Sequence, residues 1–247
     1  MFDLTFAPPL NWIYLALVVL VPLIGIAEYK GWFQLEYSKF RPTHGGMSSR
    51  VGMFILYFVP IPVYLWLARG WLDHATTTQW LLSAAMIGHF AKRCLEVLFL
   101  HKYSGPIGVL TVVQITLIYS LASALGGYLF AQAPALDALF AVGALVFLIG
   151  ETGNFTHHKI LADLRARQTG YFVPQAGLFR FVTCPHYFFE IVAWIGMALM
   201  SHQWAMLLLA FAMHNYLAAR AWKTREWYRA RFADYPRARR CMTPGLL

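Results

Sequence analysis

The chain has 247 residues, of which 59% are hydrophobic and only 13% are charged. Its mean hydropathy is +0.53. A soluble domain needs more polar side chains than this to cover its core, so the composition excludes an ordinary soluble enzyme, a disordered chain and a nucleic-acid-binding arm. Three scattered cysteines are too few for a disulfide framework. We therefore expect an integral membrane protein, whose net charge of +9 needs a membrane explanation.

A helix needs about 20 mainly apolar residues to cross the hydrocarbon layer of a bilayer. Seven stretches approach this length and predict an all-α bundle of transmembrane helices within one membrane domain, residues 1–247. The first stretch is not expected to be a cleaved signal sequence, because no basic segment precedes it. The predicted spans are residues 10–29, 50–69, 79–100, 106–131, 135–161, 186–201 and 203–221, followed by a basic cytoplasmic tail, 222–247.

The positions of Lys and Arg predict the orientation of the bundle. If the N-terminus is outside, 19 of the 20 Lys and Arg residues fall in inner loops, at inner helix ends or in the tail, and only Arg69 falls outside. Basic residues accumulate on the cytoplasmic side of membrane proteins. We therefore expect an outside N-terminus and a cytoplasmic C-terminus, in a bacterial inner membrane or the endoplasmic reticulum.

Ionisable side chains recur at helical spacing inside two of the predicted spans. Such residues are costly in a bilayer and usually face the bundle interior or an aqueous cavity. One interpretation is a self-neutralising network, and the other is a groove that opens to the cytoplasm and accepts an anionic ligand. The two stripes are His89, Arg93 and Glu96, with Lys92 placed to pair with Glu96, and Glu151, Asn154 and His158, continued by Arg165.

Several metal and nucleotide motifs do not occur in the sequence. Only His157 and His158 are close together among the nine histidines, and no His-Glu-x-x-His is present, so no catalytic metal is expected. The lone Gly-x-x-Gly at Gly150 and Gly153 is more typical of close helix packing than of phosphate binding. If a nucleotide binds, arginines and helix ends must hold its phosphates.

A series of short motifs in the C-terminal part carries a family resemblance. The motifs are Gly153-Asn-Phe with Asp163-Leu-Arg, Tyr171 to Phe179, Cys184 to Glu190 with Trp194-Ile-Gly, and Arg220 with Tyr228 and Asp234-Tyr-Pro. In this order they resemble the steroid 5α-reductase and trans-2-enoyl-CoA reductase family. The resemblance implies an enzyme in a seven-helix bundle that reduces a carbon–carbon double bond conjugated to a carbonyl, with NADPH held in the inner half of the bundle. We expect the protein to be a monomer.

The resemblance also implies which residues contact the cofactor. The guanidinium groups of Arg165 and Arg220 suit the pyrophosphate and the 2′-phosphate, because a planar fork of donors matches phosphate oxygens. Asn154 and Glu190 could hold the nicotinamide carboxamide or the ribose. The positions carried over as cofactor-binding are Asn154, His158, Arg165, Tyr171, His186, Glu190, Arg220 and Tyr228.

The expected catalytic residues depart from the pattern that the resemblance implies. The steroid branch pairs a Glu on the second span with a Tyr on the third, whereas Tyr57 and Phe90 stand at or beside these positions here. Since a phenylalanine cannot donate a hydrogen bond, Tyr57 or His89 is expected to polarise the substrate carbonyl. Trp194 and Tyr216 are expected either to line the apolar substrate cavity or simply to pack in the bundle.

Several functions remain open at this point. The resemblance favours reduction of a 3-oxo-Δ4 steroid to the 5α product by hydride transfer to the β-carbon. The motif from His89 to Ser104 looks more like the enoyl-CoA branch, which reduces trans-2-enoyl thioesters during fatty acid elongation. A methyltransferase resembling the isoprenylcysteine carboxyl type, using S-adenosylmethionine, also stays open, as does a non-catalytic lipid-binding bundle. The expected partners are an apolar enone and the lipid bilayer, with no nucleic acid and no metal.

Overall fold

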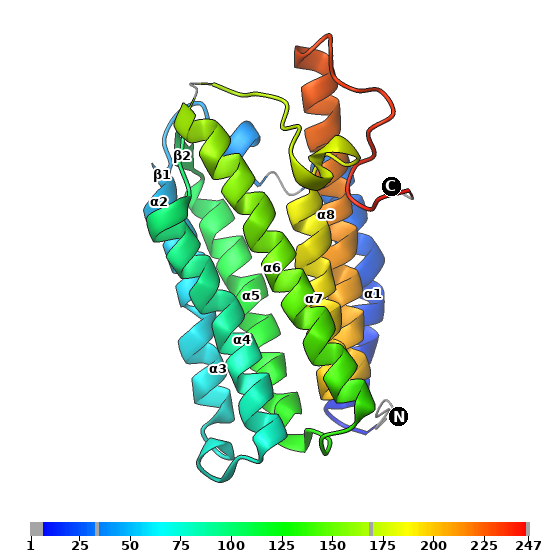
Figure 1. The fold of residues 1–247 in the computed structure, drawn as a ribbon. Helices are drawn as coiled ribbons and strands as arrows, with labels where there is room; N and C mark the ends of the chain where they lie inside the picture. Colours follow the sequence, from blue (N-terminus) through cyan, green and yellow to red (C-terminus); the bar gives the residue numbers. More distant parts are fainter. Residues whose placement is uncertain (1–6, 33–34, 168–169, 246–247) are drawn as a thin grey trace.

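The computed structural model describes residues 7–32, 35–167 and 170–245. Long helices lie side by side along one axis, and a two-residue antiparallel pair of strands near one end joins Met47 to Ile107 (Figure 1). The elements are α1 (Leu10–Lys30), η1 (Ser38–Phe40), β1 (Met47–Ser48), α2 (Ser49–Phe58), α3 (Pro60–Ala68), η2 (Leu72–His74), α4 (Thr77–Leu95), the π-helical turn η3 (Glu96–Leu100), β2 (Pro106–Ile107), α5 (Val109–Leu129), η4 (Phe130–Gln132), α6 (Ala138–Arg167), η5 (Gly177–Arg180), α7 (Pro185–Ser201) and α8 (Trp204–Arg231).

Local sequence signals explain where several helices begin and end. Thr76 and Gln79 form a capping box before α4: the Thr76 hydroxyl accepts from the Gln79 amide, and the Gln79 side chain accepts from the Thr76 amide at 2.7 Å. α1 ends at Gly31, whose φ of 76° is left-handed. Pro60 and Pro185 stand at the first turns of α3 and α7, where a missing N–H costs no helical hydrogen bond.

The predicted all-helical fold is confirmed, whereas the predicted count of seven spans is not. Within the part of the chain that the structure describes, four helical segments are long and apolar enough to cross a membrane: Leu10–Lys30, Ser49–Ala68, Val109–Gln132 and Ala138–Arg167. α7 has only 17 residues, and α4 and α8 contain too many polar side chains, so these helices do not qualify by length and composition. The seven-span topology and the orientation of the termini stay predictions.

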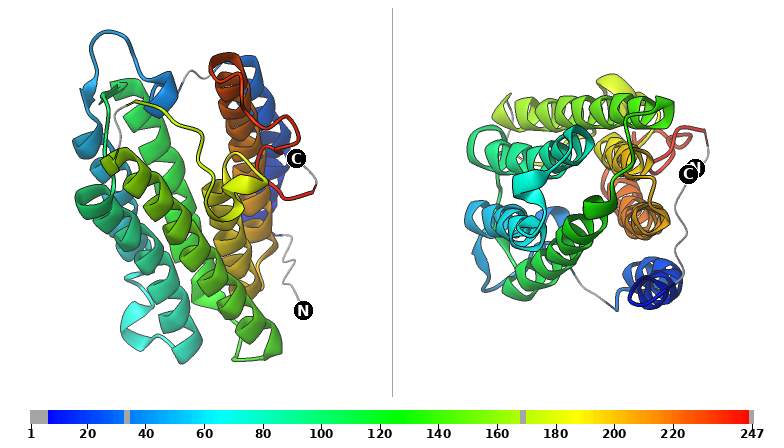
Figure 2. Two further views of the ribbon diagram at one scale, coloured as in Figure 1. Left: turned by 45° about the horizontal axis from the view of Figure 1, so that its top comes forward. Right: turned by 90° about the horizontal axis from the view of Figure 1, so that it is seen from below.

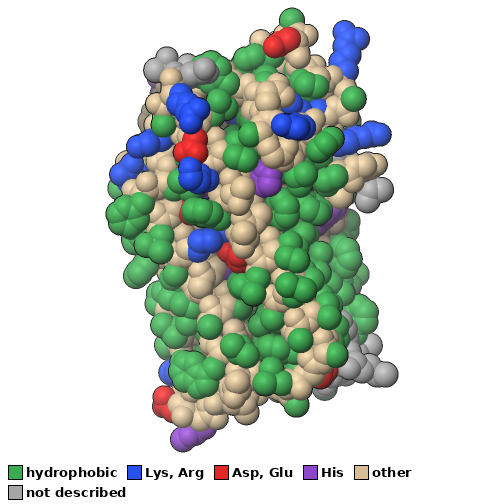
Figure 3. Space-filling view, in the orientation of Figure 1, with side chains coloured by type: hydrophobic (Ala, Val, Ile, Leu, Met, Phe, Trp, Pro, Cys, Tyr) green, Lys and Arg blue, Asp and Glu red, His purple; other side chains and the backbone are tan. Residues whose placement is uncertain are grey.

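Helix bounds also differ from the predicted spans near the basic end of the bundle. α6 continues to Arg167, beyond the predicted end at residue 161, and α8 continues to Arg231, beyond residue 221. A 30-residue helix is about 45 Å long, against about 30 Å of hydrocarbon, so α6 can extend past an apolar layer. Charged side chains gather in the upper half of the molecule and hydrophobic side chains cover most of the lower half (Figure 3).

The helices form two groups. α6 packs along α7, which also contacts α8, and α1 packs mainly against α8. On the other side, α2 and α3 pack against α5 and α4. Seen from below, α1 stands at a corner of the bundle beside α8 and away from α5 (Figure 2). This arrangement leaves the inner faces of α1 and α5 available to line a shared space.

Glycines bring α6 and α7 into close contact. A Cβ on Gly150 would lie 2.3 Å from the Ala193 amide nitrogen, and a Cβ on Gly196 would lie 2.4 Å from the Phe147 amide nitrogen. Neither position has room for a larger side chain unless the backbones separate, since real Cβ atoms almost never approach so closely. The interpretation of the Gly150 and Gly153 pair as a packing motif is therefore supported.

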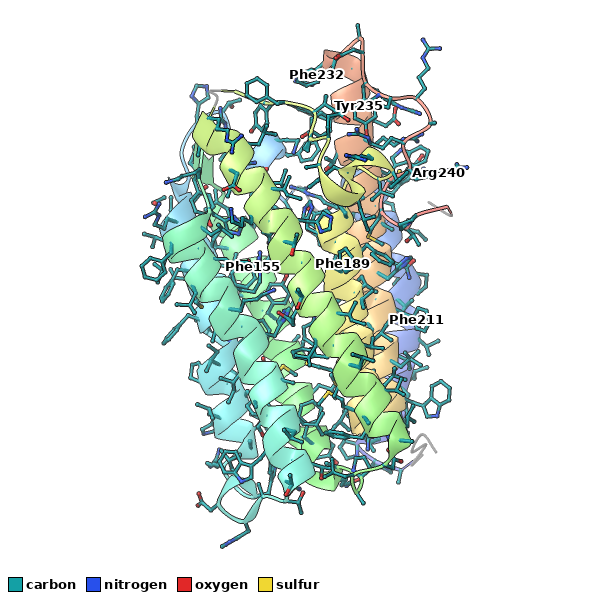
Figure 4. All side chains as sticks on the ribbon, in the orientation of Figure 1. Phe155, Phe189, Phe211, Phe232, Tyr235 and Arg240 are labelled. Carbon is teal, nitrogen blue, oxygen red and sulfur yellow. The ribbon has the colours of Figure 1, made fainter. Side chains whose placement is uncertain are left out.

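The C-terminal segment folds back onto the loop before α7. The Thr183 and Cys184 amides donate to the carbonyls of Arg240 and Cys241, each at 2.9 Å. The buried Arg239 donates to the Pro174 carbonyl at 3.0 Å and to Gln175 at 2.9 Å. The segment with Tyr235 and Arg240 descends beside the start of α7 (Figure 4). The predicted tail is thus folded over residues 222–245, while residues 246 and 247 lie outside the described part.

We predict that Gly150→Ala destabilises the protein, whereas Gly88→Ala does not. The new methyl group at position 150 would have to displace the α7 backbone, and overpacking of this kind costs about 1–3 kcal/mol. Gly88 has nothing within 4 Å of its Cβ position, so alanine there should raise helix stability by up to about 1 kcal/mol. Thermal unfolding in detergent measures both variants, and equal melting temperatures would contradict the close α6–α7 contact.

Candidate functional site

A cavity of about 730 Å³ runs between the two helix groups. Pockets of about 300–1,000 Å³ are typical of small-molecule sites. One part has apolar walls, built by Ile13, Leu17 and Leu20 of α1 together with Leu121 and Leu125 of α5. The other part is lined by tyrosine, histidine, glutamate and basic side chains. The cavity therefore suits a ligand with an apolar portion and a polar or charged portion.

Arg93 organises the polar part of the cavity. Its Nη2 donates to the Tyr57 hydroxyl at 2.8 Å, and its guanidinium carbon lies 4.6 Å from the Tyr57 ring centroid. Its Nη1 pairs with the Glu96 carboxylate and lies 2.7 Å from Nδ1 of His158. Because the Tyr57 oxygen accepts a hydrogen bond from a cation, its own proton remains available to a ligand in the cavity.

Glu96, His101 and His158 place three potential metal-ligand atoms within 4.8 Å of one another. Arg93 already contributes a positive charge to this cluster, since it contacts both Glu96 and His158. A divalent cation would meet repulsion from the guanidinium and would have to compete with it for the carboxylate. The arrangement is therefore a hydrogen-bonded ion-pair network that holds Arg93 against Tyr57.

Tyr119 of α5 is a cavity residue that the sequence reasoning missed. Its ring stacks on Tyr57 with centroids 5.6 Å apart, and its hydroxyl donates to Glu190 of α7 at 3.3 Å. Phe90 packs edge-on against the Tyr119 ring at 5.6 Å but is fully buried and is not part of the cavity wall. The only sequence signal for Tyr119 was a tyrosine in the middle of an apolar helix.

Cations without carboxylate partners gather at the polar part of the cavity. Arg165 donates to the Lys102 carbonyl at 3.0 Å, and Arg41 donates to the Ser104 hydroxyl at 2.9 Å and to its carbonyl. Lys39, Arg41, Lys102 and Arg165 all line the cavity. Among the residues that the structure describes, no ion pair joins any of these four side chains to an Asp or a Glu. Their positive charge is therefore available to an anionic ligand.

Lys39 is enclosed by aromatic rings. Its Nζ lies 4.9 Å from the ring centroid of Tyr228, 5.6 Å from that of Tyr171 and 5.8 Å from that of Trp227. Burial lowers the pKa of Lys39 to about 8. Lys39 also lines a second pocket of about 660 Å³, which contains Arg41, Tyr171, Trp227 and Arg231. It thus stands where the main cavity meets this outer pocket.

Arg220 differs from these cations because it already has partners. Its Nη1 lies 3.3 Å from the Glu28 carboxylate, and its Nη2 donates to the Tyr37 carbonyl at 3.3 Å. Lys223 pairs with the same carboxylate at 3.4 Å. Arg220 lines the cavity but only 3% of its surface is exposed. Its charge therefore first stabilises the buried Glu28, which links α8 to α1.

The structure brings most of the predicted site residues to the cavity. Tyr57, His158, Arg165, His186, Glu190, Tyr216, Arg220 and Tyr228 line it, and Tyr171 lines the outer pocket.

Three predicted residues, His89, Asn154 and Trp194, are not among the lining residues. Nδ1 of His89 lies 2.6 Å from the Glu151 carboxylate, and its ring packs against Trp194 at 5.3 Å. Asn154 accepts from Lys92 at 2.8 Å and donates to the His186 carbonyl at 2.9 Å.

Comparison with known proteins gives consistent matches over much of the chain. The sequence model of the family described as 3-oxo-5-alpha-steroid 4-dehydrogenase matches residues 106–247. The chain is 31% identical to human 3-oxo-5-alpha-steroid 4-dehydrogenase 1 over 199 residues, covering 75% of this chain and 74% of the relative. It is 32% identical to bovine 3-oxo-5-alpha-steroid 4-dehydrogenase 1, covering 68% of each. It is 29% identical to steroid 5-alpha-reductase DET2 of Arabidopsis thaliana, covering 86% of this chain and 88% of the relative.

We predict that Arg220→Met destabilises the fold by leaving the Glu28 carboxylate buried beside Lys223 alone. Breaking a buried ion pair costs up to about 3–5 kcal/mol, less what Lys223 compensates. The double variant Glu28→Gln with Arg220→Met should recover most of this loss, because the uncompensated charge is removed. Thermal unfolding compares the two variants. An equally low melting temperature for both would contradict the assignment of Glu28 as the buried charge that Arg220 compensates.

Proposed function

The chain belongs to the 3-oxo-5-alpha-steroid 4-dehydrogenase family of oxidoreductases, and we propose that it reduces the ring double bond of a 3-oxo-Δ4 steroid with NADPH. The observation that supports this proposal most directly is the division of one cavity into an apolar part and a part lined by unpaired cations. A steroid is a rigid apolar body with one polar carbonyl, and NADPH is a polyanion. The two parts of the cavity match these two chemistries.

The residues present fit the cofactor. Lys39, Arg41, Lys102 and Arg165 offer positive charge that no described carboxylate neutralises, as phosphates require. Glu190 is 6% exposed and contacts the cavity, so its carboxylate can accept hydrogen bonds from the amide of a nicotinamide or from a ribose. We assign phosphate binding to the four cations and retain Tyr171, His186, Glu190 and Tyr228 as cofactor-binding residues.

Some of the predicted cofactor residues act indirectly in this proposal. Asn154 fixes the backbone at His186 through its hydrogen bond to that carbonyl. His158 supports Arg93. Arg220 holds Glu28 and Tyr37, so its contribution to the 2′-phosphate site is secondary to that of the unpaired cations.

NADPH, when bound, supplies a hydride for the β-carbon of the enone. Negative charge then develops on the carbonyl oxygen, and a donor preorganised in a dry site stabilises that charge more than it stabilises the substrate. The Tyr57 hydroxyl fits this role, because Arg93 occupies its acceptor side and leaves its proton to the substrate. Arg93 in turn is held by Glu96. His89 remains the less direct candidate, since Glu151 engages its Nδ1 away from the cavity wall.

The apolar part of the cavity is where we place the steroid. Its walls include residues of α1 and α5, and α1 packs mainly against α8. An apolar substrate can therefore enter from the lipid without crossing the basic end of the bundle. Tyr216, whose hydroxyl lies 3.3 Å from the Tyr37 hydroxyl, belongs to the polar rim of this space. We also propose the topology predicted above, with seven spans and the basic end in the cytoplasm.

The proposal is tested with purified protein, NADPH and a 3-oxo-Δ4 steroid. We expect the steroid to cause NADPH oxidation and the 5α-reduced ketone to form. Tyr57→Phe should lower kcat by about a hundredfold, because one oxyanion donor contributes roughly two to three orders of magnitude. Tyr64→Phe is the matched control: Tyr64 is also a buried tyrosine, but its hydroxyl bonds Ser83 outside the cavity. A wild-type protein that leaves NADPH unchanged would contradict the proposal.

We also predict that NADPH affinity falls as the pH rises through about 8. Below this pH Lys39 is protonated and attracts phosphate, and above it the neutral amine loses that attraction. A hydrogen bond to a charged group contributes about 1.5–3 kcal/mol, so the loss of affinity should be roughly ten- to a hundredfold. In Lys39→Arg the affinity should stay constant over the same range, because arginine does not deprotonate. Fluorescence titration measures both, and parallel profiles would remove Lys39 from the phosphate site.

A further inference from the structure

The polar part of the cavity contains a second phenol besides Tyr57. We propose that Tyr119 is a catalytic residue that donates a second hydrogen bond to the steroid carbonyl oxygen, so that two tyrosines from different helices share the developing charge. This inference rests on the proposed function and names a residue of the same site. The family resemblance assigned no role to Tyr119.

Tyr119 lies beside Tyr57 at the cavity. The rings of Tyr57 and Tyr119 are nearly parallel, at 25°, with centroids 5.6 Å apart, and both residues line the cavity. Tyr57 belongs to α2 and Tyr119 to α5, so the two phenols approach the cavity from different helices. A carbonyl at the end of an apolar ligand can therefore reach both phenols.

The Tyr119 hydroxyl makes only a long hydrogen bond. The Tyr119 oxygen lies 3.3 Å from the Glu190 carboxylate, which is long for an O–H···O bond, since these are usually about 2.7–2.8 Å. Tyr119 itself is half-buried and faces open space on its cavity side. An oxyanion in that space can compete for the Tyr119 proton, because the existing bond to Glu190 is weak.

The neighbouring Phe90 cannot donate a hydrogen bond. Its ring contacts the Tyr119 ring but is fully buried and does not reach the cavity wall. Of these two neighbouring rings, only Tyr119 therefore offers a hydrogen-bond donor at the cavity wall. A single donor at Tyr57 would leave part of the charge unsolvated, and a second preorganised donor lowers the barrier further.

The reaction balances without consuming either tyrosine. The hydride forms a C–H bond at the β-carbon, and the electron pair of the double bond moves toward the α-carbon and the carbonyl oxygen. A proton that comes ultimately from water forms the C–H bond at the α-carbon. The enone is reduced by two electrons and the dinucleotide is oxidised by two. The phenols only stabilise the oxyanion, so each keeps its proton at the end of the cycle.

A structural role would give a different result from a catalytic one. If the Tyr119 hydroxyl merely positioned Glu190, removing that hydroxyl would disturb the site that we assign to the nicotinamide end of NADPH. The loss would then appear in the Kd for NADPH. If Tyr119 donates to the oxyanion, its removal acts mainly on the transition state, and kcat falls while NADPH binding is kept.

The experiment compares Tyr119→Phe with Tyr64→Phe, a buried tyrosine whose hydroxyl bonds Ser83 outside the cavity. Phenylalanine retains the ring and its packing on Tyr57. We expect Tyr119→Phe to lower kcat by roughly one to two orders of magnitude, with the Kd for NADPH within about twofold of the wild type. Tyr64→Phe should leave kcat unchanged. Fluorescence titration of NADPH also verifies that each variant is folded.

Two outcomes would overturn the inference while the wild type remains active: an unchanged kcat in Tyr119→Phe, or a weakened NADPH Kd with kcat retained. The second would make Tyr119 a positioning residue for Glu190. An inactive wild type would instead contradict the proposed function itself, so the two failures are distinguishable. A double variant with Tyr57→Phe adds a further check, because donors to one oxygen should show coupled effects on kcat.

Discussion

The structure depends on one constraint: a charge inside an apolar helix bundle must be neutralised locally. Removing an ion from water is expensive, and only close partners repay the cost. Arg93 meets this requirement with Glu96, His158 and the Tyr57 hydroxyl, which come from three helices or helical turns. Lys92 and His89 both pair with Glu151 across the contact between α4 and α6. These contacts fix the relative rotation of the helices, and with it the face of each helix that lines the cavity.

Cations that lack a carboxylate partner are informative because they do not follow this rule of local neutralisation. Lys39 and Arg165 lie at the cavity with no carboxylate partner among the residues described, although Glu28 and Glu96 show that the chain can supply one. Lys39 is held by aromatic faces, which attract a cation without neutralising it. A cation that is held without being neutralised can bind an anionic ligand from solution. We therefore assign the ion-paired residues inside the bundle to shaping the cavity, and the cations without a carboxylate partner to binding the ligand.

Sequence reasoning placed the two stripes on α4 and α6 correctly because ionisable residues at helical spacing in apolar segments admit few other arrangements. It left open which of the candidate residues line the cavity. His89 pairs with Glu151 and packs against Trp194, and neither lines the cavity, whereas Arg220 lines it but is paired with Glu28. Tyr119 was overlooked because a single tyrosine in the middle of an apolar helix has no local signature. Whether such a side chain lines a cavity depends on helix rotation, which no local pattern encodes.

The sequence by itself determined the helical class, the apolar segments, the capped ends of helices such as α4, the close-packing glycines of α6 and the family. Each of these features follows from composition, from short-range spacing or from motifs, so it can be recognised without the tertiary structure. Only the tertiary structure decided that Glu28 meets Arg220, that Tyr119 stacks on Tyr57, and that the C-terminal segment covers the loop before α7. These contacts join residues far apart in the chain, and their geometry results from the simultaneous packing of several helices.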